Sequence, residues 1–248
     1  MANWNDPQTP RPGFGASPSL GGTTVGNAAY DAGLRRHMLS IYNYMASGVL
    51  LTGVVALLMA RSGMAATVMN GGLLSWVIIL SPLAIVMAMS FGANRMSTGT
   101  LRALFWGFAT LMGMSMSTIF LVYTGQSIAT TFFATAAAFA GLSLFGYTTK
   151  KDLTGFGSFL IMGVVGILVA MVVNIFLQST ILQLAVSALG VLIFAGLTAY
   201  DTQRLKMQYY QLQGTQFAGK AVVLGALSLY LDFINMFQFL LMFLGNRE

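Results

Sequence analysis

The sequence has few charged side chains and no cysteine. Only 7% of its 248 residues are charged and 56% are hydrophobic, whereas a soluble domain carries roughly 25% charged residues. Too few polar side chains remain to cover a globule in water, so a soluble fold is strongly disfavoured. The absence of cysteine excludes disulfides, thiolate metal sites and thiol nucleophiles. The single histidine, His37, has no second histidine or cysteine with which to form a zinc site.

Basic residues outnumber acidic ones. Twelve lysines and arginines stand against six aspartates and glutamates, which gives a net charge of +6 and an isoelectric point near 9.8. In a soluble protein this balance would favour nucleic-acid binding. Here the basic residues lie between long apolar stretches, where they orient a chain in a membrane. Nucleic acid is therefore excluded as a partner, and membrane lipid is expected.

Seven apolar stretches approach the length of about 20 residues that crosses a bilayer as a helix. They are continuously apolar rather than alternating, which excludes the strands of a membrane β-barrel. The predicted spans are residues 41–60, 75–92, 103–124, 129–147, 155–177, 180–200 and 221–244. The predicted fold class is an all-α membrane protein with seven transmembrane helices.

Residues 1–30 differ from the rest of the chain in composition. They hold four of the five prolines and few apolar clusters, so they bury too little surface to offset the entropy of ordering. We expect a flexible cytoplasmic tail over residues 1–30 and a seven-helix transmembrane domain over residues 31–248.

The distribution of lysine and arginine predicts the orientation of the chain. Ten of the twelve basic residues lie before the first span or after the second, fourth and sixth: Arg11, Arg35, Arg36, Arg95, Arg102, Lys150, Lys151, Arg204, Lys206 and Lys220. With seven alternating helices these regions share one side of the membrane, and only Arg61 and Arg247 lie on the other. The N-terminus is therefore predicted in the cytoplasm and the C-terminus outside.

Two of the six acidic residues fall within or beside the spans. Asp232 lies about twelve residues into the last span, and Asp201 lies at the cytoplasmic end of the sixth. A carboxylate in the bilayer costs about 2.5–3.5 kcal/mol, so it should face protein or water and have a partner. If the two meet, they must share a proton or recruit a cation.

Helical spacing places Ser228, Asp232 and Asn235 on one face of the last span, which should therefore point into the bundle. A functional role for this polar face competes with a simpler one, in which Asp232 only bonds a neighbouring helix. Arg95, at the cytoplasmic end of the second span, is the candidate counter-charge. An ordinary role as a membrane-surface anchor stays open for Arg95.

At these residues the chain resembles the bacterial branch of the Bax inhibitor-1 (transmembrane Bax inhibitor motif) family. The most specific match is the C-terminal signature at residues 225–245, GALSLYLDFINMFQFLLMFLG. Supporting stretches are HMLSIYNYMASGVLLTGVVA at 37–56, FGYTTKKDLTGFGSFL at 145–160 and AYDTQRLK at 199–206. Together they extend over nearly the whole chain beyond the tail.

The resemblance implies a bundle in which the last helix is central and wrapped by the other six, in a bacterial inner membrane. It further implies a pH-sensitive, calcium-permeable leak channel whose proton sensor is an aspartate pair on the sixth and seventh helices. In this sequence the pair falls on Asp201 and Asp232, and an arginine that latches one of them falls on Arg95. No cofactor is implied beyond a weak Ca²⁺ site at the two aspartates, with help from waters, carbonyls, Ser228 or Asn235, because Ca²⁺ prefers six to eight oxygens.

Two other functions stay open. The resemblance also implies a non-conducting regulator of a membrane-anchored AAA protease, for which the tail and residues 201–220 are the candidate contacts. The aspartates fit a proton-coupled transporter almost as well. An enzyme is not expected, because the sequence has no HExxH or GxSxG motif and Asp201 lies in YDTQ rather than in a GxGD context.

Overall fold

The computed structural model describes residues 21–215 and 217–246, and every regular element in this part of the chain is helical. The elements are α1 (Gly21–Arg61), α2 (Met64–Met69), α3 (Leu73–Gly92), α4 (Thr98–Met116), the 3-10 helix η1 (Ser117–Leu121), α5 (Gly125–Thr148), α6 (Thr154–Leu177), α7 (Thr180–Leu212) and α8 (Ala218–Leu244). Seven helical segments of the described residues are long and apolar enough to cross a membrane. The predicted all-α fold with seven spans is confirmed.

Two helix boundaries and two short elements differ from the sequence prediction. Helix α1 begins at Gly21, so the last part of the predicted tail 1–30 is helical, whereas residues 1–20 lie outside the described residues. Helix α7 continues to Leu212 instead of ending near residue 200, which places Asp201 inside a continuous helix. The short helix α2 and the 3-10 segment η1 were not predicted. The chain divides into two compact units, residues 1–36 and 37–248, and the candidate functional groups lie in the second.

Hydrogen bonds join the connections at the end of the bundle that carries most basic residues. Lys206 of α7 donates to the carbonyl of Tyr147 at the end of α5 (2.8 Å). Lys220 of α8 donates to the carbonyl of Ala93, just after α3 (3.1 Å). The connections after α3, α5 and α7 therefore lie at one end of the bundle, as the alternation of seven spans requires.

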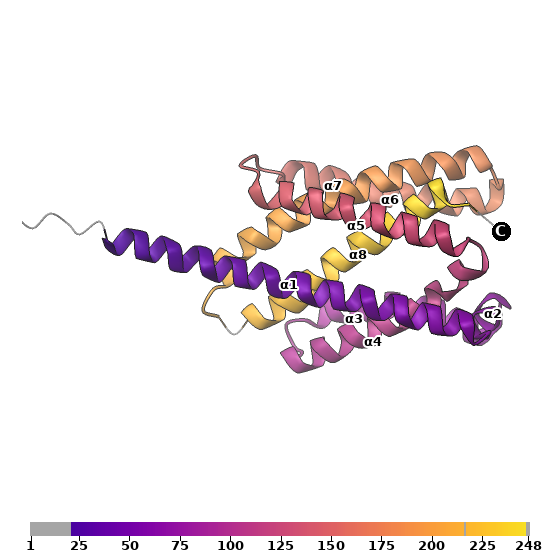
Figure 1. Cartoon of the computed structure of the whole chain (residues 1–248), viewed down its shortest axis with the longest axis horizontal. Helices are drawn as coiled ribbons and strands as arrows, with labels where there is room; N and C mark the ends of the chain where they lie inside the picture. The colour runs from indigo at the N-terminus through magenta and orange to yellow at the C-terminus, as the bar shows by residue number, and fades with distance from the viewer. Residues whose placement is uncertain (1–20, 216, 247–248) are drawn as a thin grey trace, which may run out of the picture. The chain divides into compact units, whose positions relative to one another are not determined.

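Helix α8 is the most buried of the seven spans. In an 18-residue apolar stretch of α8, 56% of the residues are buried, against 33% or less in the corresponding stretch of each other span. It packs on α4, α5 and α7, and in Figure 1 it crosses obliquely between α4 and α5. On its α1 side, the fully buried Tyr230 is hydrogen-bonded to the hydroxyl of Thr52 (2.6 Å). That all six other spans surround α8 stays a prediction.

Helix α6 is the least buried span and has the character of a lipid-facing helix. Only 11% of the residues in its 18-residue apolar stretch are buried, and the mean hydropathy of this stretch, 2.8, is the highest of the seven spans. Exposed apolar side chains cover it, including Phe159, Met162 and Leu168. Within the described residues, α6 packs extensively on α7. Helix α6 therefore lies at the periphery of the bundle and does not cover the neighbouring face of α8.

Candidate functional site

Asp201 lies on the face of α7 that packs against α8. Its side chain is buried, with 6% of the residue's surface exposed. The hydroxyl of Ser228 on α8 donates a short hydrogen bond to Oδ2 of Asp201. The other carboxyl oxygen, Oδ1, lies 3.2 Å from Nη2 of Arg204, one turn further along α7. Both oxygens of Asp201 therefore have partners, one from each helix.

Arg204 closes this arrangement into a three-residue network. Its Nη2 also donates to the Ser228 hydroxyl (3.0 Å), and its guanidinium carbon lies 5.6 Å from the centre of the Tyr200 ring. The Nε of Arg204 is buried and has no hydrogen-bond partner among the described residues. The network of Asp201, Arg204 and Ser228 joins α7 to α8 through charge-assisted hydrogen bonds.

Asp232 lies one turn beyond Ser228 on α8. It is buried, with 5% of its surface exposed, and its Oδ2 has no hydrogen-bond partner within the described part of the chain. The charges that act on its carboxyl are those of Asp201 and Arg204, both from α7. Because one guanidinium serves two carboxyl groups, the cluster is neutral only when one carboxyl is protonated or a further cation is bound.

The structure brings Asp201, Asp232 and Ser228 to one region between α7 and α8, but it does not bring Arg95 there. Arg95 lies exposed in the connection between α3 and α4. The arginine that pairs with Asp201 is instead Arg204. The sequence signal for Arg204 was its position three residues after Asp201, a spacing that allows contact on a helix. The latch role of Arg95 stays a prediction.

Asn235 and Ser228 line a cavity with Asp232. The cavity lies between α6, α7 and α8 and has a volume of about 500 Å³. The amide nitrogen of Asn235 donates to the carbonyl of Leu231 within α8 (2.8 Å). A fourth polar residue, Gln238, lines the same cavity and was not singled out from the sequence. It follows Asn235 by three residues, a spacing that places both on one face of a helix, and this was the signal available.

The weak Ca²⁺ site expected at Asp201 and Asp232 stays a prediction. The described residues contain no cluster of three or more histidine, cysteine, aspartate or glutamate side chains. Ca²⁺ takes six to eight oxygen ligands, and Asp201 already uses both oxygens in the network with Ser228 and Arg204. The free oxygen of Asp232, with the amide of Asn235 and water, fits a transiently held cation better than a stored one.

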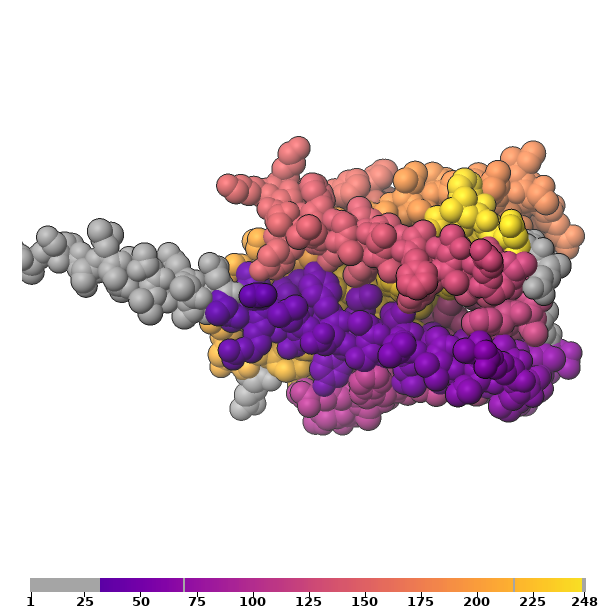
Figure 2. Space-filling view, in the orientation of Figure 1, coloured from indigo at the N-terminus to yellow at the C-terminus, as the bar shows by residue number. Residues whose placement is uncertain are grey.

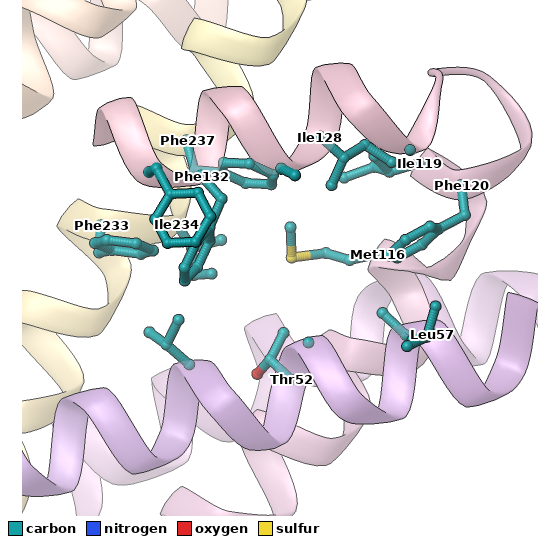
Figure 3. Close-up of a pocket in the computed structure, with 16 residues that line it drawn as sticks. Thr52, Leu57, Met116, Ile119, Phe120, Ile128, Phe132, Phe233, Ile234 and Phe237 are labelled. Atoms are coloured by element: carbon teal, nitrogen blue, oxygen red, sulfur yellow. The ribbon is translucent and has the colours of Figure 1, made fainter. Parts of the chain in front are cut away.

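An apolar cavity of about 290 Å³ lies on the opposite side of α8. It is formed by α1, α4, η1, α5 and α8, and Figure 2 shows atoms of α8 between α1 and α5 on this face. In Figure 3, Phe132, Phe233 and Phe237 gather at one end and the side chain of Met116 points into the space. Thr52 contributes the polar side chain. Helix α8 therefore presents a polar face to one cavity and an apolar face to the other.

A further acidic residue, Asp152, has a structural role. It lies exposed before α6, and its Oδ1 accepts hydrogen bonds from the backbone NH (2.9 Å) and hydroxyl (2.6 Å) of Thr154. These bonds favour the charged form and lower the pKa of Asp152 below its ordinary value of 3.8. Asp152 therefore stays ionised above pH 5.

Together these features define a multi-pass helical membrane protein with two buried carboxyl groups between its last two spans. The chain belongs to the Bax inhibitor-1 family, because the family profile described as "Inhibitor of apoptosis-promoting Bax1" matches residues 34–248.

Relatives at substantial identity support the assignment. A protein of Caulobacter vibrioides is 52% identical over 232 residues, which cover 88% of this chain and 92% of the relative. The inner membrane protein YbhL of Escherichia coli is 44% identical over 220 residues, covering 88% of this chain and 94% of YbhL. A Streptococcus pyogenes membrane protein is 33% identical over 221 residues, covering 88% and 96%. These names agree with the seven apolar spans of this chain.

Proposed function

We propose that this protein is a pH-sensitive, calcium-permeable leak channel of the inner membrane, with Asp201 and Asp232 as its proton sensor. One observation carries the proposal. Asp232 is a buried carboxyl group within a membrane span, and its Oδ2 has no hydrogen-bond partner among the described residues. Ionisable groups at such depth are expensive and usually mark an ion or proton pathway.

The charge balance of the cluster supplies a mechanism. Arg204 and Ser228 each donate to Asp201, so this carboxyl group has a counter-charge and a hydrogen-bond donor beside it. Asp232 then has no counter-charge of its own. Helices α5 and α6 carry no charged side chain, and the charged residue of α4, Arg102, is exposed and lies over the Tyr44 ring. At low pH a proton neutralises Asp232 and the two helices stay together. As the pH rises the proton leaves, and a cation takes its place or like charges push α7 and α8 apart.

The direct test is Ca²⁺ flux in proteoliposomes between pH 5 and pH 8. We expect flux through the unmodified protein to rise with pH, and Asp232→Asn to remove most of this dependence, because an amide has no proton to lose in this range. Asp201→Asn should also alter it, since Arg204 is then free to neutralise Asp232. Asp152→Asn is the matched control: Asp152 is exposed and stays ionised throughout this range.

Unchanged flux and an unchanged pH response in both Asp201→Asn and Asp232→Asn would remove the sensor from the proposal. Saturable uptake of a solute, driven by a proton gradient and lost in Asp232→Asn, would instead identify a proton-coupled transporter. The buried carboxyl in a cavity supports this reading by the same chemistry. A regulator of a membrane-anchored AAA protease would bind its partner without Asp232. Its predicted contacts fall partly on residues 1–20, outside the described residues.

A further inference from the structure

The α8 face beside Asp232 is incompletely covered along its length. Between Val223 and Phe239 every residue is buried except five half-buried ones, Leu224, Ser228, Leu231, Asn235 and Gln238. Their spacing of three or four residues places them on one side of the helix. Three of the five are polar. This stripe is therefore less tightly covered than the rest of the most buried span.

The close packing of α6 on α7 leaves this stripe open. A Cβ on Gly157 of α6 would meet the Tyr200 ring, and one on Gly196 of α7 would meet Leu160. A Cβ on Gly163 would lie 2.8 Å from a methyl of Ile193. Through these glycines α6 lies close to α7, and the space between α6 and α8 is the cavity of about 500 Å³ that Asp232 lines.

A second cavity extends the first towards the turn between α6 and α7. It has a volume of about 440 Å³ and shares Met171 and Met242 with the first. Amide side chains line it: Asn174, Gln178 and Gln183. Asn174 Oδ1 accepts a hydrogen bond from the backbone NH of Ser179 in the α6–α7 turn (3.0 Å), and this bond holds Asn174 in place at the edge of the second cavity.

From the adjoining cavities and the partnerless oxygen of Asp232, we infer that water and small cations reach Asp232 through a trough between α6, α7 and α8. We call it the amide trough, and its polar residues are Ser228, Asp232, Asn235, Gln238, Asn174, Gln178 and Gln183. It opens at the α6–α7 turn, at the end of the bundle opposite the basic connections. As an ion route it rests on the proposed channel function, whereas its hydration does not.

Lipid is the rival occupant, and the side chains argue against it. The carboxyl oxygen of Asp232 has no protein partner among the described residues, and Asn174 and Asn235 each use only part of their hydrogen-bonding capacity. Such groups are unfavourable in hydrocarbon, where water cannot satisfy them. The cavity on the other side of α8 shows what an apolar space in this protein looks like, since Thr52 supplies its polar side chain among aromatic and aliphatic neighbours. Most side chains that line the cavity beside Asp232 are apolar too, but its four polar residues lie together on α8. Water is held at that face, because it finds several hydrogen-bond partners there.

Cysteine accessibility tests the inference, because the chain has no cysteine of its own. We would introduce Gln238→Cys and Gln183→Cys in the trough. The control is Phe237→Cys, because Phe237 is next to Gln238 on α8 but lines the apolar cavity. Charged methanethiosulfonate reagents that do not cross membranes are added to vesicles of each orientation. Since only a hydrated thiol ionises and reacts, Gln238→Cys should react at least about tenfold faster than Phe237→Cys, and only from the side of the α6–α7 turn.

The charge of the reagent tests whether the trough favours cations. Clefts lined by one sign of charge raise the local concentration of the opposite ion. A cationic reagent should therefore modify Gln238→Cys about tenfold faster than an anionic one, after correction for their rates with a free thiol. Adding Asp232→Asn should remove this preference. Asn235→Cys gives a second reading at the same depth if Gln238→Cys does not purify as a single species.

Reaction of Gln238→Cys and Asn235→Cys no faster than that of Phe237→Cys would overturn the inference. So would modification only from the side of the basic connections. The outcome is separable from that of the channel proposal. Fast modification without Ca²⁺ flux would support the trough and contradict the channel proposal. Ca²⁺ flux without modification would support the channel proposal and show that its ions follow another route.

Discussion

At the scale of single residues, the arginine on α7 holds the site together. Arg204 contacts Asp201 and Ser228 and acts electrostatically on Asp232. Removing its charge leaves a proton or a bound cation as the counter-charge for two carboxyl groups. Because an opposite charge at this range is worth about 1–3 pH units, we expect Arg204→Gln to move the midpoint of pH-dependent Ca²⁺ flux upward by at least about one unit.

Arg95→Gln is the informative comparison in that experiment. Arg95 is exposed and has no ion pair among the described residues, so its loss should leave the midpoint unchanged. A larger shift in Arg95→Gln than in Arg204→Gln would support the latch that the family resemblance implies, and it would require the connection between α3 and α4 to move towards Asp201 or Asp232.

The two aspartates of the candidate site could be selected from the sequence, but the arginine that pairs with Asp201 could not. Asp201 and Asp232 could be predicted because a carboxyl in an apolar span needs a physical reason to be there. Arg204 could not be ranked above Arg95, because its selection depends on where α7 ends. With the helix ending near residue 200, Arg204 reads as an anchor at the membrane surface. With α7 continuing to Leu212, it becomes a neighbour of Asp201 on the same face.

At the scale of helices, close backbone approaches fix how the spans pack. Gly146 of α5 is buried, and a Cβ there would collide with the backbone carbonyl of Ala199 on α7. Because a backbone cannot rotate away as a side chain can, we expect Gly146→Ala to destabilise the protein by about 1–3 kcal/mol. Gly141→Ala is the matched control, since it lies exposed on the same helix with nothing within 4 Å of its added methyl group.

The melting temperature of both variants is measured in mild detergent, with gel filtration as the readout of the fraction that stays folded. The melting temperature should fall clearly in Gly146→Ala and stay the same or rise slightly in Gly141→Ala, because alanine favours a helix. An equal response of the two variants would mean that α5 can move away from α7 at little cost. In that case the contact would not fix the position of Asp201.

The number and order of the spans could be predicted from hydropathy, but their ends could not. The residues after Asp201 are polar and also good helix formers, including Gln203, Arg204 and Lys206. Hydropathy therefore marks where the membrane ends, while the helix itself continues. The six-residue helix α2 is too short for a periodic pattern to reveal. The cavities could not be predicted either, because they depend on which helix α6 packs against.

At the scale of the whole molecule, the number of spans and the distribution of charge make one joint prediction. Ten of the twelve basic residues lie on one side if all seven helices cross the membrane. The hydrogen bonds of Lys206 and Lys220 draw the connections after α3, α5 and α7 to the same end. Basic connections stay in the cytoplasm, so the C-terminus and the α6–α7 turn should face outward, and the amide trough should open there.

Reporter fusions decide the orientation. Alkaline phosphatase is active only outside the cytoplasm, and green fluorescent protein folds to its fluorescent form in the cytoplasm. A phosphatase fused at the C-terminus should be active, and one inserted at Gly214, between α7 and α8, should be inactive, with fluorescence in the opposite order. Fluorescence at both positions would mean that α8 does not cross the membrane. Asp232 would then lie outside the bilayer, and its burial would need an explanation other than ion passage.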